Sequence, residues 1–219
     1  QHQLWEGVAL TSRRSDTYHH GNLRQVLLDH AVDLARTGGP DAVVMRDVQR
    51  LAGVSNSAAY RHYADRGELL AAVTEHAQTL LADAMAARLD AVASRGSKAK
   101  RALARFRATG QGYLDFALAE PGLFRTAFAH NVSGDSGTAD EPVRVPEHHP
   151  FQILIRCIDE LIATGVLAAD RRDGLDEAAW AAVHGLSTLL LDGPLSGLDD
   201  ARRQLIIDRL LDVIADGLQ

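Results

Sequence analysis

The sequence has little cysteine and no long hydrophobic run. Cys157 is the single cysteine among 219 residues, which excludes an intramolecular disulfide and fits a reducing compartment. No apolar stretch approaches the roughly 20 residues that a membrane-spanning helix needs, and residues 1–15 show no secretory signal. We therefore expect a cytoplasmic protein without a membrane partner.

Positive charge is also scarce. The 23 Lys and Arg residues are outnumbered by 29 Asp and Glu residues, which gives a formal net charge of −6. Residues 1–66 carry eight Arg and seven acidic residues, whereas residues 67–219 carry 15 basic and 22 acidic residues. Since no basic run occurs, any affinity for nucleic acid must come from a few well-placed side chains and not from a bulk positive field.

Apolar residues are abundant, and almost all of them recur at helical spacing. They make up 46% of the chain, and no convincing strand alternation is present, so we predict an all-α fold. Two capping pairs, Asn22 with Gln25 and Asp65 with Glu68, mark helix starts. Residues 131–149 are predicted to form a mobile loop. The predicted helices run from Asn22 to the stop at Gly38-Gly39-Pro40, from Val44 to Ala52, from Ser55 to about Tyr63, from Asp65 to about Val92, and near 98–119, 121–130, 150–165, 174–192 and 199–217.

Two of the short helices, joined at Gly53, match a helix-turn-helix. Glycine tolerates the positive φ of a tight corner, and the Ser55 hydroxyl can cap the second helix, while Ala59 and Tyr63 are predicted to face inward. A glycine between short helices also occurs in many other α-helical proteins, so the pattern alone leaves a purely structural role open. The exposed residues of the second helix's first turn are small or carry an amide, as entry into a DNA groove requires: Asn56, Ser57 and Ala58.

Longer stretches carry a family resemblance. Residues 41–73, DAVVMRDVQRLAGVSNSAAYRHYADRGELLAAV, contain an A-G-V-S turn, a Y-R-H-aromatic segment and D-R-x-E-L-L, and they resemble the N-terminal DNA-binding domain of TetR/AcrR-family regulators. The branch with a WHG-type C-terminal domain is similar in the lead-in 18–24, in DFALAEPGLFRTAF (115–128) and in AAWAAVHGLSTLLLDGPL (178–195). That last segment holds the residues for which the branch is named, Trp180, His184 and Gly185.

The resemblance implies a domain organisation and a function. It implies a disordered or partly ordered tail at 1–17, a three-helix DNA-binding domain at 18–66, and a ligand-binding and dimerisation domain at 67–219. The function implied is sequence-specific transcriptional regulation, most often repression that a small apolar or amphipathic ligand relieves. A DNA-binding dimer that acts constitutively, without any small ligand, is the alternative.

The resemblance also implies the DNA contacts. Arg46 would reach a base edge or a phosphate, and Arg66 would approach the DNA backbone from the start of the long helix. Arg and Asn make the most discriminating base contacts in general, so Arg46, Asn56 and Arg61 are the specificity candidates. His19 and His20 are further candidates for backbone contact. The full set of implied DNA-binding residues is Arg46, Ser55, Asn56, Ser57, Ala58, Tyr60, Arg61, His62 and Arg66.

The last two predicted helices favour a homodimer. One helix-turn-helix reads few base pairs, whereas a two-fold dimer reads both half-sites of a palindromic operator, spaced roughly 34–36 Å or a multiple apart. The alternative is that both helices belong to the core of one chain. The apolar residues in question are Trp180, Val183, Leu186, Leu189, Leu190 and Leu191, with Leu205, Ile206, Leu210, Val213, Ile214 and Leu218.

Aromatic residues in the middle of the chain suggest a pocket for an unidentified small molecule. Ligand pockets are mostly apolar with a few polar groups, and His130 and Gln152 are possible polar members besides His184. An aromatic stripe at helical spacing is, however, more often plain core. The predicted pocket residues are Tyr113, Phe116, Phe124, Phe128, Phe151, Trp180 and His184.

Enzyme and metal chemistry find little support in the sequence. It has no phosphate-binding Gly-rich loop, no H-E-x-x-H helix and no nucleophile elbow. The chain has ten His, with His19-His20 and His148-His149 adjacent, but adjacent side chains diverge on regular structure and no i, i+4 His pair occurs. We expect a protein that is not an enzyme and that needs neither a metal nor a cofactor.

Overall fold

The computed structural model describes residues 22–129 and 147–217. Within these ranges the chain is all-helical and has no strand, as predicted. The tail at 1–17, residues 131–146 of the predicted loop, and the predicted contacts His19, His20, His130 and Leu218 lie outside the described residues. In chain order the elements are α1 (Leu23–Gly38), η1 (Pro40–Ala42), α2 (Met45–Ala52), α3 (Asn56–Tyr60), α4 (Arg66–Asp90), α5 (Lys98–Ala119), α6 (Pro121–Ala127), α7 (Pro150–Ala163), η2 (Ala169–Arg171), α8 (Leu175–Leu191) and α9 (Asp200–Asp216).

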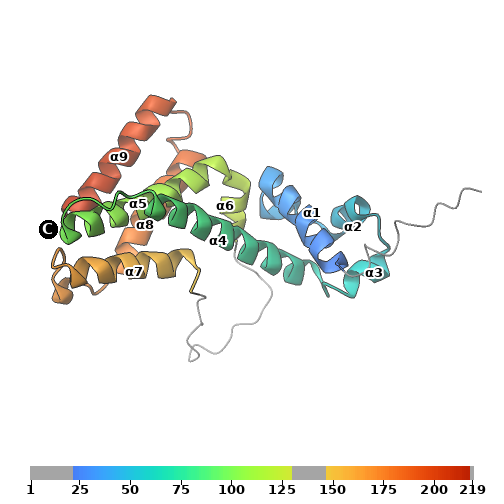
Figure 1. Cartoon of the computed structure of the whole chain (residues 1–219). Helices are drawn as coiled ribbons and strands as arrows, with labels where there is room; N and C mark the ends of the chain where they lie inside the picture. Colours follow the sequence, from blue (N-terminus) through green and yellow to red (C-terminus); the bar gives the residue numbers. More distant parts are fainter. Residues whose placement is uncertain (1–21, 130–146, 218–219) are drawn as a thin grey trace, which may run out of the picture.

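Helices α1 to α3 form a small unit at one end of the molecule, which we call the reading head (residues 23–63; Figure 1). Its core is made by Leu27 of α1, Val48 of α2 and Ala59 of α3, all of which are buried. Helix α4 runs from this end into the remaining helices (Figure 1). The predicted division between residues 66 and 67 falls in the first turn of α4, so one continuous helix joins the two parts.

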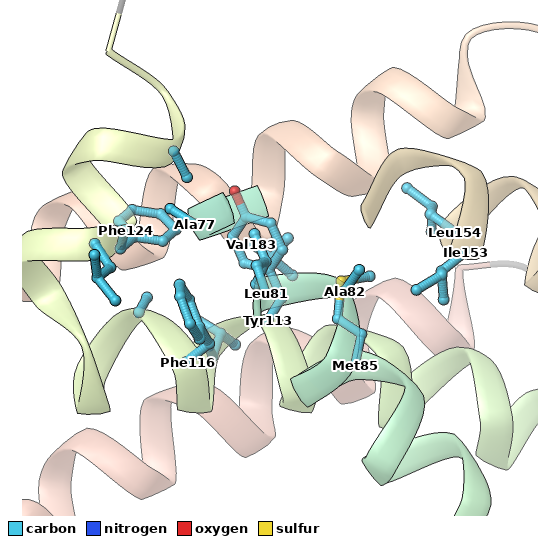
Figure 2. Packing of buried hydrophobic residues seen from close by; sticks show 14 of the residues in the cluster. Ala77, Leu81, Ala82, Met85, Tyr113, Phe116, Phe124, Ile153, Leu154 and Val183 are labelled. Carbon is cyan, nitrogen blue, oxygen red and sulfur yellow. The ribbon is translucent and has the colours of Figure 1, made fainter. Parts of the chain in front are cut away.

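The remaining helices pack around α5, which contacts α4, α6, α7, α8 and α9. Gly112 of α5 touches α4 directly, since a Cβ at this position would lie 2.7 Å from the Cα of Met85. Figure 2 shows the side chains of these helices gathered into one apolar core, with Leu81 and Tyr113 near its centre. None of the described helices combines the length and hydropathy that a membrane span requires.

The helix starts follow the predicted signals, whereas two helices end earlier than predicted, α3 at Tyr60 and α6 at Ala127. Ser55 Oγ accepts from the Ala58 N–H at 3.3 Å, and Asp65 Oδ1 accepts from the Glu68 N–H at 2.9 Å, so both side chains cap their helices. Asn22 directly precedes α1 as predicted, but the predicted capping bonds with Gln25 are wrong. The Asn22 side chain makes no capping bond, and Gln25 Nε2 donates 2.8 Å to Asp29 Oδ1 on the same helix.

Helix α6 connects the reading head to the larger unit. Its Gly122 lies against the end of α1, where a Cβ would collide with the carbonyl oxygens of Ala35 and Arg36. Arg36 Nε also donates 3.0 Å to Glu120 Oε2, just before α6. The reading head is therefore held from two sides, by the continuous helix α4 and by the start of α6.

Candidate nucleic-acid interface and aromatic pocket

The turn between α2 and α3 has the backbone that a helix-turn-helix needs. Gly53 ends α2 in the left-handed region at φ 66°, which favours glycine. The Val54 N–H donates 3.2 Å to the Gln49 carbonyl and closes the corner. Ala59 and Tyr63 are buried, as predicted, and they dock α3 against the rest of the reading head.

The predicted DNA contacts lie mostly on the open side of the reading head. Ser57 and Arg61 are on the side of α3 opposite Ala59, and Tyr60 beside them is 43% exposed. Ala58 and His62 are half-buried. The remaining members of the predicted set that are also exposed are Arg46, Ser55, Asn56 and Arg66.

Arg66 has a structural role that the sequence did not indicate. Its Nε donates to the carbonyl of Val43 and its Nη2 to the carbonyl of Pro40, both at 2.7 Å. The Pro40 carbonyl belongs to η1, and the Val43 carbonyl belongs to the segment that leads into α2. Helix α2 carries Arg46. Arg66 therefore holds the start of α2 in place, and its contact with the DNA backbone stays a prediction.

A second arginine, Arg24 of α1, was not predicted to belong to the interface. Its guanidinium donates to the His62 carbonyl and lies 4.3 Å from the centroid of the Tyr63 ring. The Tyr63 hydroxyl donates 3.3 Å to the Arg24 carbonyl, and Glu68 pairs with Arg24 at 3.5 Å. Burial raises the pKa of Tyr63, so the hydroxyl stays protonated and keeps this bond. These contacts tie α1 to the residues that directly follow α3, and they were not predicted from the sequence.

Six of the seven predicted pocket residues meet in one aromatic cluster, which we define as Tyr113, Phe124, Phe128, Phe151, Trp180 and His184. Ring centroids of Phe128 and His184 are 4.8 Å apart, and those of Phe151 and Trp180 are 5.0 Å apart. The cluster joins α5, α6, α7 and α8. Phe116 is buried in the core but is not part of these ring contacts, and Gln152 is half-buried on α7.

Three polar groups are bonded to one another inside the aromatic cluster. Trp180 Nε1 donates 3.2 Å to the Tyr113 hydroxyl, which lies 2.8 Å from His184 Nδ1. Since the indole N–H can only donate, we infer that the Tyr113 hydrogen goes to His184 Nδ1, which leaves a neutral ring protonated on Nε2. Burial lowers the pKa of His184 and raises the pKa of Tyr113, so both groups are held uncharged.

Two hollows adjoin the cluster, on either side of Trp180. One is a narrow cavity of about 40 Å³ that Tyr113, Phe151 and Trp180 line, far below the roughly 300–1,000 Å³ of ligand pockets. Its one charged lining residue, Arg107, is paired with Asp208 and Asp212 of α9. The other is an open groove of about 510 Å³, lined by Thr74, Gln78, Ala127, Phe128, Ala129, Glu177, Trp180, Ala181 and His184.

Helix α6 links the aromatic cluster to the helices around it. Thr74 and Gln78 of α4 donate to the carbonyls of Thr126 and Ala127 at 3.1 and 2.9 Å. Arg125 pairs with Asp192 at the end of α8, with Nε 2.9 Å from Oδ2. Since the start of α6 also touches α1, this short helix contacts both the aromatic cluster and the reading head.

The described residues offer no group of three His, Cys, Asp or Glu that could hold a metal ion. His148, one of the adjacent histidines, instead lies with its Nε2 2.7 Å from Asp83 Oδ1. His149 Nδ1 accepts from the Phe151 N–H at 3.2 Å and caps α7.

Three of the apolar residues predicted for the dimer helices are buried in the core of a single chain, and five more are partly buried against it. Val183, Leu186 and Leu190 are buried, because α8 packs on α5 and α7. The exposed large apolar side chains of α8 and α9 are Leu189 at 42%, Leu205 at 50% and Val213 at 61% exposure.

Comparison with known proteins identifies both parts of the chain. Residues 27–73 match the family model for bacterial regulatory proteins of the tetR family, and residues 106–214 match the tetracyclin repressor-like C-terminal domain. No curated protein matches the sequence.

Solved structures share the fold along almost the whole length. A protein of unknown function from Rhodococcus sp. RHA1 is 28% identical with a TM-score of 0.70, over 93% of this chain and 99% of that one. A candidate regulatory protein, SCO4313, is 18% identical with a TM-score of 0.59, over 92% and 98%. A candidate tetR family regulator from Shewanella sp. PV-4 is 19% identical with a TM-score of 0.50, over 87% and 96%. The last two matches show the fold alone. With both family domains matched in order and the helix-turn-helix in place, the chain belongs to the TetR family of bacterial transcriptional regulators.

Proposed function

We propose that the protein is a cytoplasmic repressor that binds a palindromic operator as a homodimer and is released by a small apolar or amphipathic ligand. In this proposal residues 18–66 read DNA and residues 67–219 bind the ligand and the second subunit. The WHG-type branch is also part of the proposal, since Trp180 and His184 share the aromatic cluster and Gly185 lies one residue further along α8.

The DNA side of the proposal rests on the exposed polar residues of α2 and α3. Asn56, Ser57 and Arg61 would enter the major groove, Arg46 would reach a base edge or phosphate beside them, and Tyr60 would bond to a phosphate. His62 is half-buried, and its carbonyl is held by Arg24. A phosphate contact by its ring is part of the proposal.

The single observation that carries ligand control is the position of α6. Phe124 of α6 and Phe128 directly after it are ring partners of Tyr113 and His184, while Gly122 at the other end touches α1. A ligand that separates the aromatic rings must move α6, and it then changes how the reading head is held. Release follows only if the ligand binds this second arrangement better than the DNA-bound one.

The chemistry of the cluster supports an uncharged ligand. The narrow cavity has aromatic walls, the uncharged Tyr113 hydroxyl and an arginine already paired with two carboxylates, while the neutral His184 ring lines the neighbouring groove. A charged group of a ligand, buried here without a partner, would cost roughly several kcal/mol. A hydroxyl or carbonyl on an otherwise apolar ligand could instead exchange for one of the existing hydrogen bonds.

The exposed face of α8 and α9 supports the dimer. Leu205 and Val213 are eight residues apart on α9 and therefore lie on one side of it. On α8, Gly185 is exposed, and the space where its Cβ would lie holds no other atom. Small residues let helix backbones approach closely, so two copies of α8 and α9 can form a four-helix interface.

A constitutive DNA-binding dimer is the second candidate, and the small cavity favours it. With about 40 Å³, the narrow cavity accommodates little more than a water molecule, so only the open groove has room for a larger ligand in the resting structure. The two candidates differ in whether Trp180 and α6 can move apart for a ligand.

Two measurements on the purified full-length chain test the proposal. DNA fragments that it enriches are sequenced, and an inverted repeat is expected; no enrichment at low salt would refute DNA reading. Uncharged apolar compounds are then screened by thermal shift, because a ligand of the native state must raise Tm. A hit that also weakens operator binding supports the repressor, whereas hits that never affect DNA binding support the constitutive dimer.

A further inference from the structure

A side-chain pair bridges α2 and α3 at the DNA-reading surface. Gln49 of α2 is half-buried, and its Nε2 donates 2.9 Å to Oδ1 of the exposed Asn56. The backbone of Gln49 is held as well, since its carbonyl accepts from the Val54 N–H at 3.2 Å. Gln49 is thus anchored at the corner, and Asn56 takes its orientation from it.

The bond determines which end of the Asn56 amide is free. Oδ1 is turned toward Gln49, whereas Nδ2 has no hydrogen-bond partner within the described part of the chain. A side-chain amide has two donor hydrogens on nitrogen and an acceptor oxygen. Asn56 therefore turns its oxygen toward Gln49 and its two donor hydrogens away from it, toward an incoming ligand.

The side-chain oxygen of the neighbouring Ser55 is also bonded within the protein. Ser55 Oγ accepts from the Ala58 N–H at 3.3 Å and lies 3.2 Å from Ser57 Oγ. The guanidinium groups of Arg46 and Arg61 can only donate. The two arginines therefore add further donors to those of the Asn56 amide.

We propose that Gln49 is a positioning residue that sets base specificity by holding Asn56 with its amide nitrogen outward. The inference rests on the proposed DNA-binding function and deepens it. An unrestrained Asn reads adenine with both amide atoms, accepting from N6 and donating to N7. With its oxygen held by Gln49, Asn56 donates to acceptors alone, and guanine, which presents both O6 and N7 in the major groove, is its preferred base.

The test uses the full-length protein and a library of randomised duplexes. The base pair read by Asn56 is identified first, as the pair at which Asn56→Ala loses its preference. The wild type is expected to select guanine there. Gln49→Leu removes the donor and frees the Asn56 oxygen, so preference at that pair shifts from guanine toward adenine by about tenfold, the size of one bidentate contact.

Three further variants separate positioning from simple structural support. Gln49→Glu accepts a bond from Asn56 Nδ2 and turns the oxygen outward, so it shifts the preference in the same direction. In the Asn56→Ala background, Gln49→Leu has no further effect on that base pair, because Gln49 acts through Asn56. Gln25→Leu makes the same chemical change in α1, where it breaks only the bond to Asp29, and leaves the preference unaltered.

Specific outcomes would overturn the inference. Wild-type selection of adenine at that pair, or an unchanged guanine preference in folded Gln49→Leu and Gln49→Glu proteins, contradicts it while leaving DNA binding intact. If Gln49→Leu does not fold, judged by its Tm, the nearly isosteric Gln49→Glu gives the answer. Failure of the wild type to enrich any sequence contradicts the proposed function itself, which is a different result.

Discussion

The contact between α6 and α1 makes Gly122→Ala an informative substitution. The added Cβ would collide with the carbonyl oxygens of Ala35 and Arg36. Both are backbone atoms within α1, so no side-chain rotation relieves the clash. Either α6 or the end of α1 must move, and the Arg36–Glu120 pair beside it is disturbed as well.

The cost follows from this close contact. Overpacking costs about 1–3 kcal/mol. The gain from replacing glycine by alanine applies to the middle of a helix, and Gly122 lies in the first turn of α6, so it offsets little of this cost. The free energy of unfolding should therefore fall by about 1–3 kcal/mol. For a chain of this size each kcal/mol lowers Tm by about 2–4 °C, so we expect a decrease of roughly 2–12 °C.

Thermal unfolding of the purified variant measures the effect, and Gly197→Ala is the matched control. No atom lies within 4 Å of a Cβ at Gly197, so this variant should keep the wild-type Tm. The reading head of Gly122→Ala should also bind operator DNA with an affinity less sensitive to ligand, because α6 no longer transmits its position to α1. A Gly122→Ala protein with the Tm and ligand response of the wild type would show that α6 and α1 are not tightly coupled.

Three further predictions concern the aromatic cluster and the exposed face. Tyr113→Phe leaves two nitrogen partners unbonded and should lower the free energy of urea unfolding by about 1–3 kcal/mol; an unchanged midpoint would contradict the bonded arrangement. Because burial lowers the pKa of His184, the unfolded chain binds its proton more tightly, so stability is complete above about pH 6.5 and is lost as the pH falls below it. His184→Gln should lose less stability between pH 7.5 and 5.5 than the wild type, and equal losses would assign the effect elsewhere. Leu205→Glu combined with Val213→Glu should halve the mass measured by light scattering, whereas the exposed Val44→Glu should not; a double variant that stays dimeric would rule out this face.

Helix positions and most helix starts were predictable because they depend on local signals. Apolar spacing identifies a buried face, and the caps at Ser55 and Asp65 act within three residues. The predicted capping bonds between Asn22 and Gln25 do not form, and the Gln25 side chain bonds to Asp29. Both arrangements are compatible with the local sequence, which does not tell which of them is more stable.

Contacts between distant segments were not predictable, and the site depends on them. The helical spacing of apolar residues in α8 indicated that Val183 and Leu190 are buried. This spacing does not tell whether the helix that covers them belongs to the same chain or to a second one. The Arg66 side chain looked free for DNA, yet it bonds to carbonyls more than 20 residues earlier. The aromatic density of the middle helices predicted Phe116 in the pocket with Tyr113, but Phe116 is buried in the core outside the ring contacts.

The most direct test of the account is the operator selectivity of a double variant, Arg46→Ala with Arg61→Ala. Both guanidinium groups are exposed on the reading head, and the account assigns base recognition to them together with Asn56. The ratio of dissociation constants for operator and unrelated duplex is measured at one salt concentration for wild type and variant. We expect the ratio to fall by at least tenfold, since each good base contact is worth about 1–3 kcal/mol of discrimination. A folded double variant that still distinguishes the operator as the wild type does would contradict the assignment of α2 and α3 as the surface that reads DNA.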